Sequence, residues 1–417
     1  MTVERPKYIE QLMNARGNGL VKIVTGIRRC GKSFLLSTLF VDELKKAGTG
    51  EDNIMFVNMD NIRSRKFRNP ETLLDAVESF CQRSNTMHYV IIDEVQMVDD
   101  FVELLNSLLH IPNLDVYVTG SNSKFLSTDI ATEFRGRSFE IHLWPLSFAE
   151  CLSAFKGGST EAWAYYKIYG GLPALIPMTD EERESYLRQL ATTVYLRDIV
   201  ERYNVENTAE MRELMRVLAS SVGSLTNATN IANTFKSKKR LSLSDNTISK
   251  YIKYLEESFL LERCVRYDIR GKQYIGAQAK YYYQDIGIRN ATLSFRQSDD
   301  GHVMENVVYN ELRARGFSVD VGNVIVRPQG EPRQTLEVDF VANKGGQRYY
   351  VQSVYQMLSD EKMIQEKRSL LHINDSFKKI LLSMDHQNVR HDENGIVTMG
   401  LMHFFPTKTA WRRKFNV

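Results

Sequence analysis

The fold of the first part of this chain is decided by the stretch Gly26-Ile27-Arg28-Arg29-Cys30-Gly31-Lys32-Ser33. Its two glycines permit a tight turn and a close approach of the backbone, so that backbone N–H groups can surround phosphate oxygens. A short apolar run at residues 20–25 comes before the stretch, and an amphipathic helical pattern at residues 34–44 follows it. This context predicts a P-loop between a buried strand and a helix whose N-terminus favours anions.

The P-loop predicts a site for a nucleoside triphosphate with Mg²⁺, and we expect the nucleotide to be ATP. Lys32 should contact the β- and γ-phosphates, and the Ser33 hydroxyl should bind the metal. The expected cofactor-binding residues are Gly26, Ile27, Arg28, Arg29, Cys30, Gly31, Lys32, Ser33 and Phe34.

A second motif supports this site: an apolar strand ends in two acids in Tyr89-Val90-Ile91-Ile92-Asp93-Glu94. Asp93 should hold Mg²⁺ through water, and Glu94 should orient and activate the water that attacks the γ-phosphate. Gln96 could help to place this water, or it could cap the next helix. The two motifs together predict hydrolysis as well as binding.

Small polar residues follow a further strand at residues 116–119. We expect Ser121 to sense the γ-phosphate, with Asn122 as the second choice; a polar turn without a catalytic role is the alternative. The segment Glu133-Phe134-Arg135-Gly136-Arg137 comes next. Arg137, or failing that Arg135, could stabilise charge on the transferred phosphoryl group, from the same or a neighbouring subunit. A surface arginine paired with a carboxylate is the alternative.

Composition restricts the class of protein. The 417 residues are 43% hydrophobic and 25% charged, as in ordinary globular proteins. The net charge is only +3, so any affinity for nucleic acid must come from local basic runs such as 236–240 and 412–414, each of which could equally be a solvated surface. The four cysteines lack metal-ligand spacing, and Cys30 in the P-loop suits a reducing compartment. Without a signal-peptide pattern or a long apolar run, we expect a cytoplasmic protein with no membrane partner.

The pattern along the chain predicts an α/β protein of four parts. Residues 1–145 alternate apolar strands at 20–25, 53–58, 89–92, 116–119 and 141–143 with helices, which indicates a parallel sheet covered on both faces. Residues 146–205 read as a helical lid or connector. Residues 206–290 read as three helices and a hairpin, typical of a winged helix-turn-helix. Residues 291–417 read as a second α/β domain.

Several of these motifs together resemble a prokaryotic AAA-type P-loop ATPase family whose members carry a C-terminal domain of uncharacterised function. The resemblance covers nearly the whole chain and rests on the P-loop with paired arginines, Ile-Ile-Asp-Glu-Val-Gln, Thr-Gly-Ser-Asn, Arg-Gly-Arg followed by Trp-Pro-Leu-Ser-Phe, and Tyr169-Gly170-Gly171-Leu172-Pro173. It implies an AAA-like ATPase core, a winged-helix middle region and a C-terminal domain of restriction-endonuclease-like fold.

Nucleases of that fold combine an acid on the first helix, an acid on a strand, and an acid or glutamine followed two residues later by lysine on the next strand. Glu305, Asp339 and Gln352 match the first three positions, but Val354 stands where the lysine should be. Valine can neither bind a metal nor polarise water. We therefore expect the nuclease-like fold without efficient cleavage, with Glu305 and Asp339 in structural hydrogen bonds.

These expectations leave three functions open. The leading hypothesis is an ATP-driven switch or motor acting on DNA, with the basic run at 236–240, Lys250 and Lys253 of the winged helix contacting the phosphate backbone. The second is a signalling or scaffold ATPase that forms a homo-oligomer and binds a protein partner. The third is an ATP-regulated nuclease.

Overall fold

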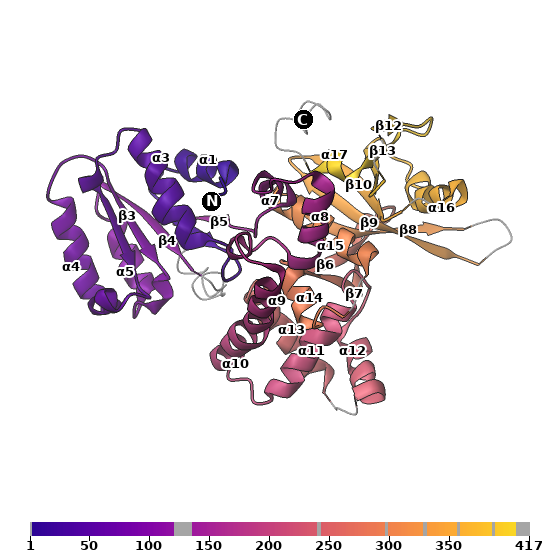
Figure 1. Cartoon of the computed structure of the whole chain (residues 1–417), viewed down its shortest axis with the longest axis horizontal. Helices are drawn as coiled ribbons and strands as arrows, with labels where there is room; N and C mark the ends of the chain where they lie inside the picture. Colours follow the sequence, from indigo (N-terminus) through magenta and orange to yellow (C-terminus); the bar gives the residue numbers. More distant parts are fainter. Residues whose placement is uncertain are drawn as a thin grey trace. The chain divides into compact units, whose positions relative to one another are not determined.

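The computed structural model describes residues 2–120, 136–239, 243–296, 299–327, 332–356, 359–385 and 388–405. The chain forms two compact units. The N-terminal unit comprises Met1–Pro145, Leu172–Ala174 and Glu257–Phe259, and the C-terminal unit comprises Leu146–Gly171, Leu175–Glu256 and Leu260–Val417. Figure 1 shows the first mainly in indigo and violet and the second in magenta to yellow.

The N-terminal unit is built on a parallel five-stranded sheet of order β2-β3-β4-β1-β5. Its strands are β1 (Val21–Thr25), β2 (Ile54–Asn58), β3 (His88–Asp93), β4 (Leu114–Thr119) and β5 (Ser138–His142). The predicted parallel α/β sheet is therefore confirmed. Since the strands are parallel, their carboxyl ends all lie at one edge, where α/β proteins bind ligands.

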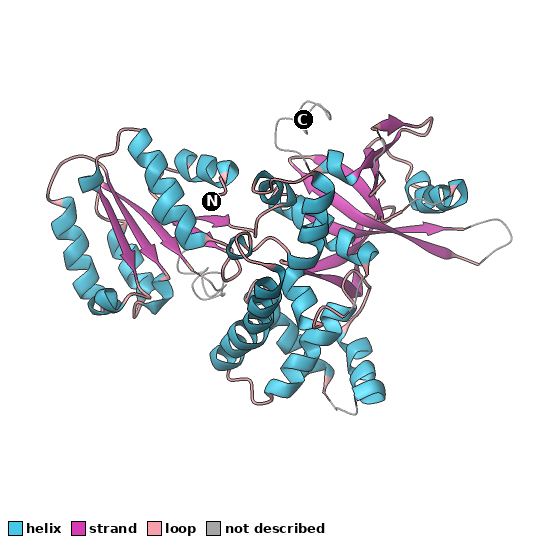
Figure 2. Ribbon diagram, viewed as in Figure 1, coloured by secondary structure: helices cyan, strands magenta, loops and turns pink. Residues whose placement is uncertain are grey.

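Both faces of this sheet are covered (Figure 2). One face packs against α4 (Pro70–Cys81) and α5 (Phe101–Leu108), whose apolar side chains share a core with β1, β3 and β4. On the other face the Phe40 ring lies 4.6 Å from the Tyr117 ring of β4. Phe40 ends a π-helical segment, Leu35–Phe40, which continues α2 (Lys32–Phe34) and leads into α3 (Val41–Lys46). Helix α1 (Pro6–Asn14) contacts this segment and β5.

Short 3₁₀ turns complete the N-terminal unit at Glu51–Asn53, Ile62–Arg68 and Val95–Met97. The last of these follows β3 directly, so the chain turns sharply after Asp93. Glu94 makes this turn with a left-handed backbone (φ 57°), which is unusual for a residue with a side chain.

The C-terminal unit begins with helices. These are α7 (Phe148–Ser153), α8 (Ser159–Tyr169), α9 (Asp180–Gln189), α10 (Leu196–Tyr203), α11 (Thr208–Ser220), α12 (Ala228–Thr234), α13 (Asp245–Glu257) and α14 (Ile286–Thr292). A 3₁₀ turn at Pro173–Leu175 and π-helical segments at Leu190–Tyr195 and Phe235–Lys239 lie between some of them.

An eight-stranded mixed sheet of order β12-β13-β11-β10-β9-β8-β6-β7 forms the rest of this unit. Its strands are β6 (Leu261–Asp268), β7 (Gln273–Tyr283), β8 (Ser318–Val326), β9 (Gln334–Lys344), β10 (Gln347–Val354), β11 (Lys378–Ser383), β12 (Arg390–His391) and β13 (Ile396–Gly400). Helices α15 (Asp300–Ala314), α16 (Asp360–Leu371) and α17 (Leu401–Phe404) accompany it.

Helices α15 and α16 cover opposite faces of this sheet. The ring centre of Phe340 lies 6.1 Å from that of Tyr309 on α15. The next residue, Val341, belongs to the same apolar core as Leu370 of α16. Successive side chains of a strand point to opposite faces, which separates the two helices.

The hairpin of β6 and β7 follows the helices α11, α12 and α13, as the sequence predicts for a winged helix. β6 also pairs in parallel with β8, so the hairpin is part of the large sheet. That sheet includes strands from both sides of residue 290. The winged helix-turn-helix and the subdivision of this unit stay predictions.

No helix among the described residues is long and apolar enough to cross a membrane.

Candidate nucleotide-binding site

The loop after β1 has a backbone that requires glycine at both of its ends. Gly26 has φ 140°, and a Cβ built there would lie 2.2 Å from the Leu143 carbonyl oxygen of the neighbouring chain segment. Gly31 has φ 101°, a conformation that disfavours any side chain. Arg29 between them also has a positive φ, of 67°. The backbone of the loop therefore explains why glycine stands at positions 26 and 31 of the motif.

Side chains inside the loop point mostly into the protein. Ile27 and Cys30 are fully buried, so only their backbone atoms can face a ligand. Burial raises the pKa of the Cys30 thiol, which disfavours a reactive thiolate. Arg28 is half-buried and Arg29 is exposed. The predicted contributions of this loop are thus backbone N–H groups, with the two arginines as the side chains nearest to solvent.

Lys32 follows the loop at the start of α2 and is buried. Its Nζ donates to the carbonyl oxygens of Gly26, at 2.9 Å, and Ile27, at 3.2 Å. Both acceptors belong to the loop itself. The ammonium group therefore lies against the concave side of the loop, where the sequence predicts phosphate groups.

Ser33, Asp93 and Thr119 converge at the carboxyl edge of the sheet. The Ser33 hydroxyl donates to Asp93 Oδ1 at 2.9 Å, and the Thr119 hydroxyl donates to the same oxygen at 2.7 Å. Parallel register explains the meeting: Val24 of β1 lies beside Thr119 of β4, and Ile92 of β3 lies beside Val118. β4 thus lies between the P-loop strand and the strand that ends in Asp93.

Burial raises the pKa of Asp93, while the hydrogen bonds from Thr119 and Ser33 lower it. A buried carboxylate beside a serine hydroxyl offers hard oxygen ligands of the kind that Mg²⁺ prefers. The two residues that the sequence assigns to the metal therefore lie together. Their chemistry fits Mg²⁺.

Glu94 lies one residue beyond Asp93, and its left-handed backbone turns the chain away from the sheet. Its backbone N–H donates to Thr119 Oγ1 at 2.8 Å, and its carboxylate accepts from Gln96 Nε2. Gln96 therefore contacts the predicted catalytic acid.

Thr119 is the residue of this group that the sequence reading missed. It is buried, it binds Asp93 through its hydroxyl, and it accepts the N–H of Glu94. The feature that could have identified Thr119 is its position as the last residue of β4, the strand that pairs with both β1 and β3. The predicted sensor Ser121 and its reserve Asn122 lie outside the described residues, as does Arg135.

Arg137 is described and exposed, and its Nη1 donates to Asn106 Oδ1 at 2.9 Å. Its backbone carbonyl accepts from the N–H of Val21, the first residue of β1. The predicted role of Arg137 at the phosphoryl group stays a prediction.

The Tyr-Gly-Gly-Leu-Pro motif contributes to the N-terminal unit through Leu172 and Pro173. Leu172 is fully buried, and Pro173 Cγ lies 3.6 Å from the position of a Cβ built at Gly31. The proline therefore packs close to the end of the P-loop.

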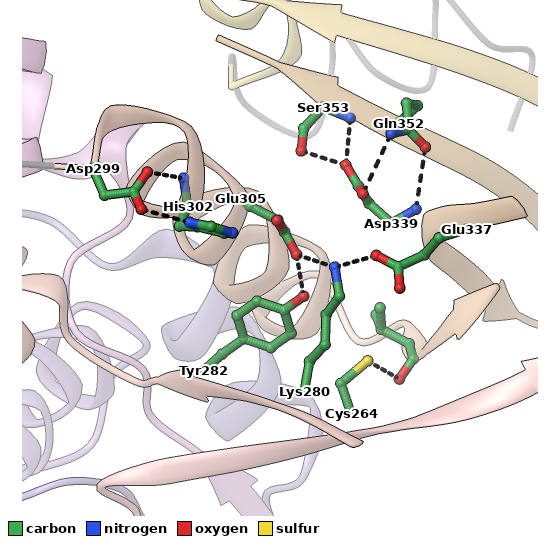
Figure 3. A network of polar contacts seen from close by, with 11 residues as sticks. Cys264, Lys280, Tyr282, Asp299, His302, Glu305, Glu337, Asp339, Gln352 and Ser353 are labelled. Carbon is green, nitrogen blue, oxygen red and sulfur yellow. Dashed lines mark hydrogen bonds and ion pairs between the residues drawn. The ribbon is translucent and has the colours of Figure 1, made fainter. Parts of the chain in front are cut away.

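A second polar cluster lies in the C-terminal unit (Figure 3). Lys280 of β7 contacts two carboxylates, with Nζ 2.7 Å from Glu305 Oε1 and 2.7 Å from Glu337 Oε1. Tyr282 also donates to Glu305, at 2.6 Å. Burial by itself lowers the pKa of Lys280, but the carboxylates of Glu305, Asp339 and Glu337 together raise it above its usual value. The ammonium group thus stays charged and paired.

Side-chain hydrogen bonds of Asp339 and Gln352 connect β9 and β10 where their backbone pairing stops. The β9–β10 pairing ends at Phe340 and Val351. Beyond it, Asp339 Oδ2 accepts the Ser353 N–H at 2.8 Å and the Ser353 hydroxyl at 2.7 Å, while Gln352 Oε1 accepts the Asp339 N–H at 3.3 Å. Burial and the nearby Glu305 raise the pKa of Asp339 to about 7.

Val354, at the position where the nuclease pattern has lysine, packs in the apolar core with Val341 and Leu370. Within the described residues, no group of three or more His, Cys, Asp or Glu side chains is arranged to hold a metal ion.

Comparison with known proteins supports an AAA-type domain in the N-terminal unit. Residues 18–152 match the family profile described as "AAA domain", and residues 160–299 match a domain of unknown function (DUF8612). An uncharacterized protein of Haemophilus influenzae is 33% identical over 386 residues, which cover 91% of this chain and 93% of that protein. Uncharacterized protein MJ1544 of Methanocaldococcus jannaschii is 26% identical over 388 residues, covering 86% and 84%.

Similarity to solved structures is weaker. The Aeropyrum pernix ORC1 protein, solved in complex with DNA, is 12% identical, with a TM-score of 0.30, and the match covers 70% of this chain and 92% of that one. A likeness of this size assigns neither a fold nor a partner to the whole chain. The identity with the bacterial relative over nearly both full lengths is decisive. This chain belongs to the family of the Haemophilus influenzae protein and carries an AAA-type P-loop ATPase domain.

Proposed function

We propose that this protein binds and hydrolyses ATP with Mg²⁺ and uses the nucleotide as a switch or motor acting on DNA. The observation that carries the ATPase part is the meeting of Ser33, Asp93 and Thr119 beside a P-loop whose lysine donates to two carbonyls of the loop itself. A hydroxyl and a carboxylate 2.9 Å apart are oxygen ligands of the kind that would hold Mg²⁺.

Each residue then has a role. The backbone N–H groups from Gly26 to Gly31 bind phosphate oxygens, and Lys32 exchanges its two carbonyl acceptors for the β- and γ-phosphates. Mg²⁺, when bound, neutralises charge on these phosphates. Asp93 and Ser33 would hold the metal, and Glu94 would orient the attacking water. Ser121 and Arg137 are the proposed sensor and charge-stabilising residues.

Two variants test this site. Lys32→Ala should weaken ATP binding strongly, because it removes the cation beside the phosphates. Glu94→Gln keeps size and hydrogen-bonding capacity, so it should retain binding and slow turnover by about 100-fold, the scale of a lost general base. Lys45→Ala is the matched control, since Lys45 is a surface residue paired with Glu51. Parent-rate hydrolysis by Glu94→Gln would refute its assignment as the catalytic carboxylate.

DNA is the proposed partner of the helices α11, α12 and α13. Lys236, Lys250 and Lys253 are exposed there, which suits contact with a phosphate backbone. Lys250→Glu with Lys253→Glu should lower affinity for duplex DNA and reduce its dependence on salt. If the parent protein binds no DNA even at low salt, the alternative of a homo-oligomeric signalling or scaffold ATPase with a protein partner takes its place.

For the C-terminal unit we propose a restriction-endonuclease-like fold without efficient cleavage. Lys280 brings an ammonium group to the acids from a strand that the sequence pattern does not include, and this is the observation in favour of an ATP-regulated nuclease as a second candidate. Two observations weigh against it: the ammonium is engaged with two carboxylates, and Asp339 is engaged with Ser353. Cleavage of DNA with Mg²⁺ or Mn²⁺ that is lost in Asp339→Ala would establish the nuclease.

A further inference from the structure

We infer that a hollow beside the C-terminal end of α16 binds an anionic ligand that carries two or more phosphate groups. The hollow has a volume of about 450 Å³, and its lining residues are Arg270, Ile325, Val326, Arg327, Arg368 and His372. They come from the segment after β6, from β8 and its end, and from α16. The inference does not depend on the proposed ATPase function.

The charge of the lining is the first argument. Three arginines and one histidine line the hollow, and none of the lining residues that the structure describes is acidic. Arginine remains protonated at every physiological pH, so the three positive charges are permanent. Cations gathered without a carboxylate repel one another, and a bound anion removes this repulsion.

The hydrogen bonds of these side chains go to neutral oxygens. Arg270 Nη2 donates to the His372 carbonyl at 3.1 Å, and His372 Nδ1 lies 2.8 Å from the Arg368 carbonyl oxygen. Arg368 Nη2 donates to the Gln334 amide oxygen at 2.7 Å. Each guanidinium group has five N–H donors, so Arg270 and Arg368 retain donors for a ligand.

A structural explanation accounts for only part of this arrangement. Cations near a helix C-terminus offset the helix dipole, and Arg270 and His372 contact the last carbonyl groups of α16. The dipole, however, corresponds to about half a negative charge. Three arginines exceed it several-fold, and Arg327 follows β8 and is not part of α16.

The backbone around the hollow is fixed by one apolar core. Ile269, Val326, Leu370 and Ile373 all belong to this core. They are chain neighbours of Arg270, Arg327, Arg368 and His372, at most two residues away. A ligand would therefore meet cations whose backbones are already positioned, which lowers the entropy lost on binding.

The shape of guanidinium and the size of the hollow identify the ligand class. The planar fork of arginine matches the oxygens of a phosphate group in pairs. The volume lies in the range of sites for drug-sized molecules, roughly 300–1,000 Å³, and so leaves room for more than one phosphate group. Two sources supply this chemistry: the backbone of a nucleic acid and the polyphosphate chain of a free nucleotide.

The test uses the full-length Lys32→Ala protein, so that the P-loop does not compete for the probes. Arg327→Glu and Arg368→Glu are added together; both side chains are exposed, so the fold should survive. The control adds Arg188→Glu and Arg197→Glu, whose side chains are 43% and 70% exposed on α9 and α10 and which cause the same change in charge. The probes are a fluorescent 20-base-pair DNA duplex and inorganic tripolyphosphate.

Anisotropy between 50 and 200 mM NaCl measures DNA binding, and calorimetry measures tripolyphosphate binding. The Arg327/Arg368 variant should lose at least 10-fold in affinity for one probe, whereas the Arg188/Arg197 control should not. If DNA is that probe, the slope of log affinity against log salt should also fall by about two, one for each lost phosphate contact. The probe that responds identifies the source. If neither probe separates the variant from its control, the inference is wrong.

Discussion

Lys32 in the N-terminal unit and Lys280 in the C-terminal unit are both buried beside acidic residues, but different groups hold their ammonium ends. Lys32 donates to two backbone carbonyls of its own loop, whereas Lys280 lies 2.7 Å from each of two carboxylates. The acids differ as well. Asp93 accepts from two hydroxyl groups, and Asp339 accepts from the backbone and hydroxyl of Ser353 where two strands separate.

This difference separates a site that is ready for a charged ligand from one that already contains its counter-charge. Exchanging two carbonyl acceptors for phosphate oxygens costs Lys32 little, because neutral acceptors are weaker partners than charged ones. Removing Lys280 from its carboxylates would leave buried negative charge without compensation. The first cluster therefore suits a nucleotide, and the second suits a structural role. Four predictions follow from the contrast, in order of decreasing effect.

Lys280→Met should destabilise the C-terminal unit by about 3–5 kcal/mol, because Glu305, Glu337 and Asp339 lose the ammonium group between them. Lys32→Met should change the stability of the N-terminal unit less, by about 1 kcal/mol, because the hydrogen bonds that it loses go to neutral carbonyls. Hydrogen exchange of peptides from each unit, followed by mass spectrometry, measures both effects. Equal destabilisation by the two variants would show that the charged partners of Lys280 and the neutral partners of Lys32 do not differ in their effect on stability.

ATP with Mg²⁺ at 100 times its dissociation constant should stabilise the N-terminal unit by about 2.7 kcal/mol, by mass action alone. Peptides that contain Ser33 and Asp93 should exchange more slowly, while peptides around Lys280 keep their rates. Lys32→Ala should abolish the protection. Equal slowing around Lys280 would mean that the second cluster also responds to the ligand.

Thr119→Val should cost about 1–3 kcal/mol, because Asp93 loses a donor and the buried N–H of Glu94 loses its acceptor. We expect ATP turnover to fall about 10-fold, since both acidic residues lose a positioning contact. Thr119→Ser keeps the hydroxyl and serves as the control. Steady-state hydrolysis and urea unfolding measure the two effects; unchanged values in Thr119→Val would show that this hydroxyl has no positioning role.

The smallest effect is the one that a change of a single pH unit has on stability through Asp339. The pKa of Asp339 is raised to about 7 in the folded protein, from an ordinary value of 3.8. The folded state then holds the proton more tightly than the unfolded state between these values. The contribution of Asp339 to the free energy of unfolding is fully present below pH 4. It is lost as pH rises through 7, at up to about 1.4 kcal/mol per pH unit.

Asp339→Asn should flatten this part of the pH profile of unfolding, since asparagine does not titrate. Glu361→Gln, in the first turn of α16, is the control. A profile that keeps its slope in Asp339→Asn would assign the titration to another group.

Prediction from sequence succeeded where the pattern is local. The apolar runs fixed the strands of the N-terminal sheet to within a few residues, because a parallel strand buried on both faces must be apolar along its length. The P-loop was readable because Gly26 and Gly31 are required by the backbone itself. Thr119 was missed because its role depends on which strands lie side by side. The residues of a single segment do not determine the order of strands in a sheet.

The sequence by itself determined the P-loop, the acids that follow the third predicted strand and the parallel α/β character of the first unit. Each of these rests on residues that lie next to one another in the chain. Only the tertiary structure decided that Thr119 binds Asp93, that Lys280 lies among the acids of the C-terminal unit, and that three arginines and a histidine line one hollow. The members of each group come from segments tens of residues apart in the chain. The folding of each unit, and not their spacing in the sequence, brings them together.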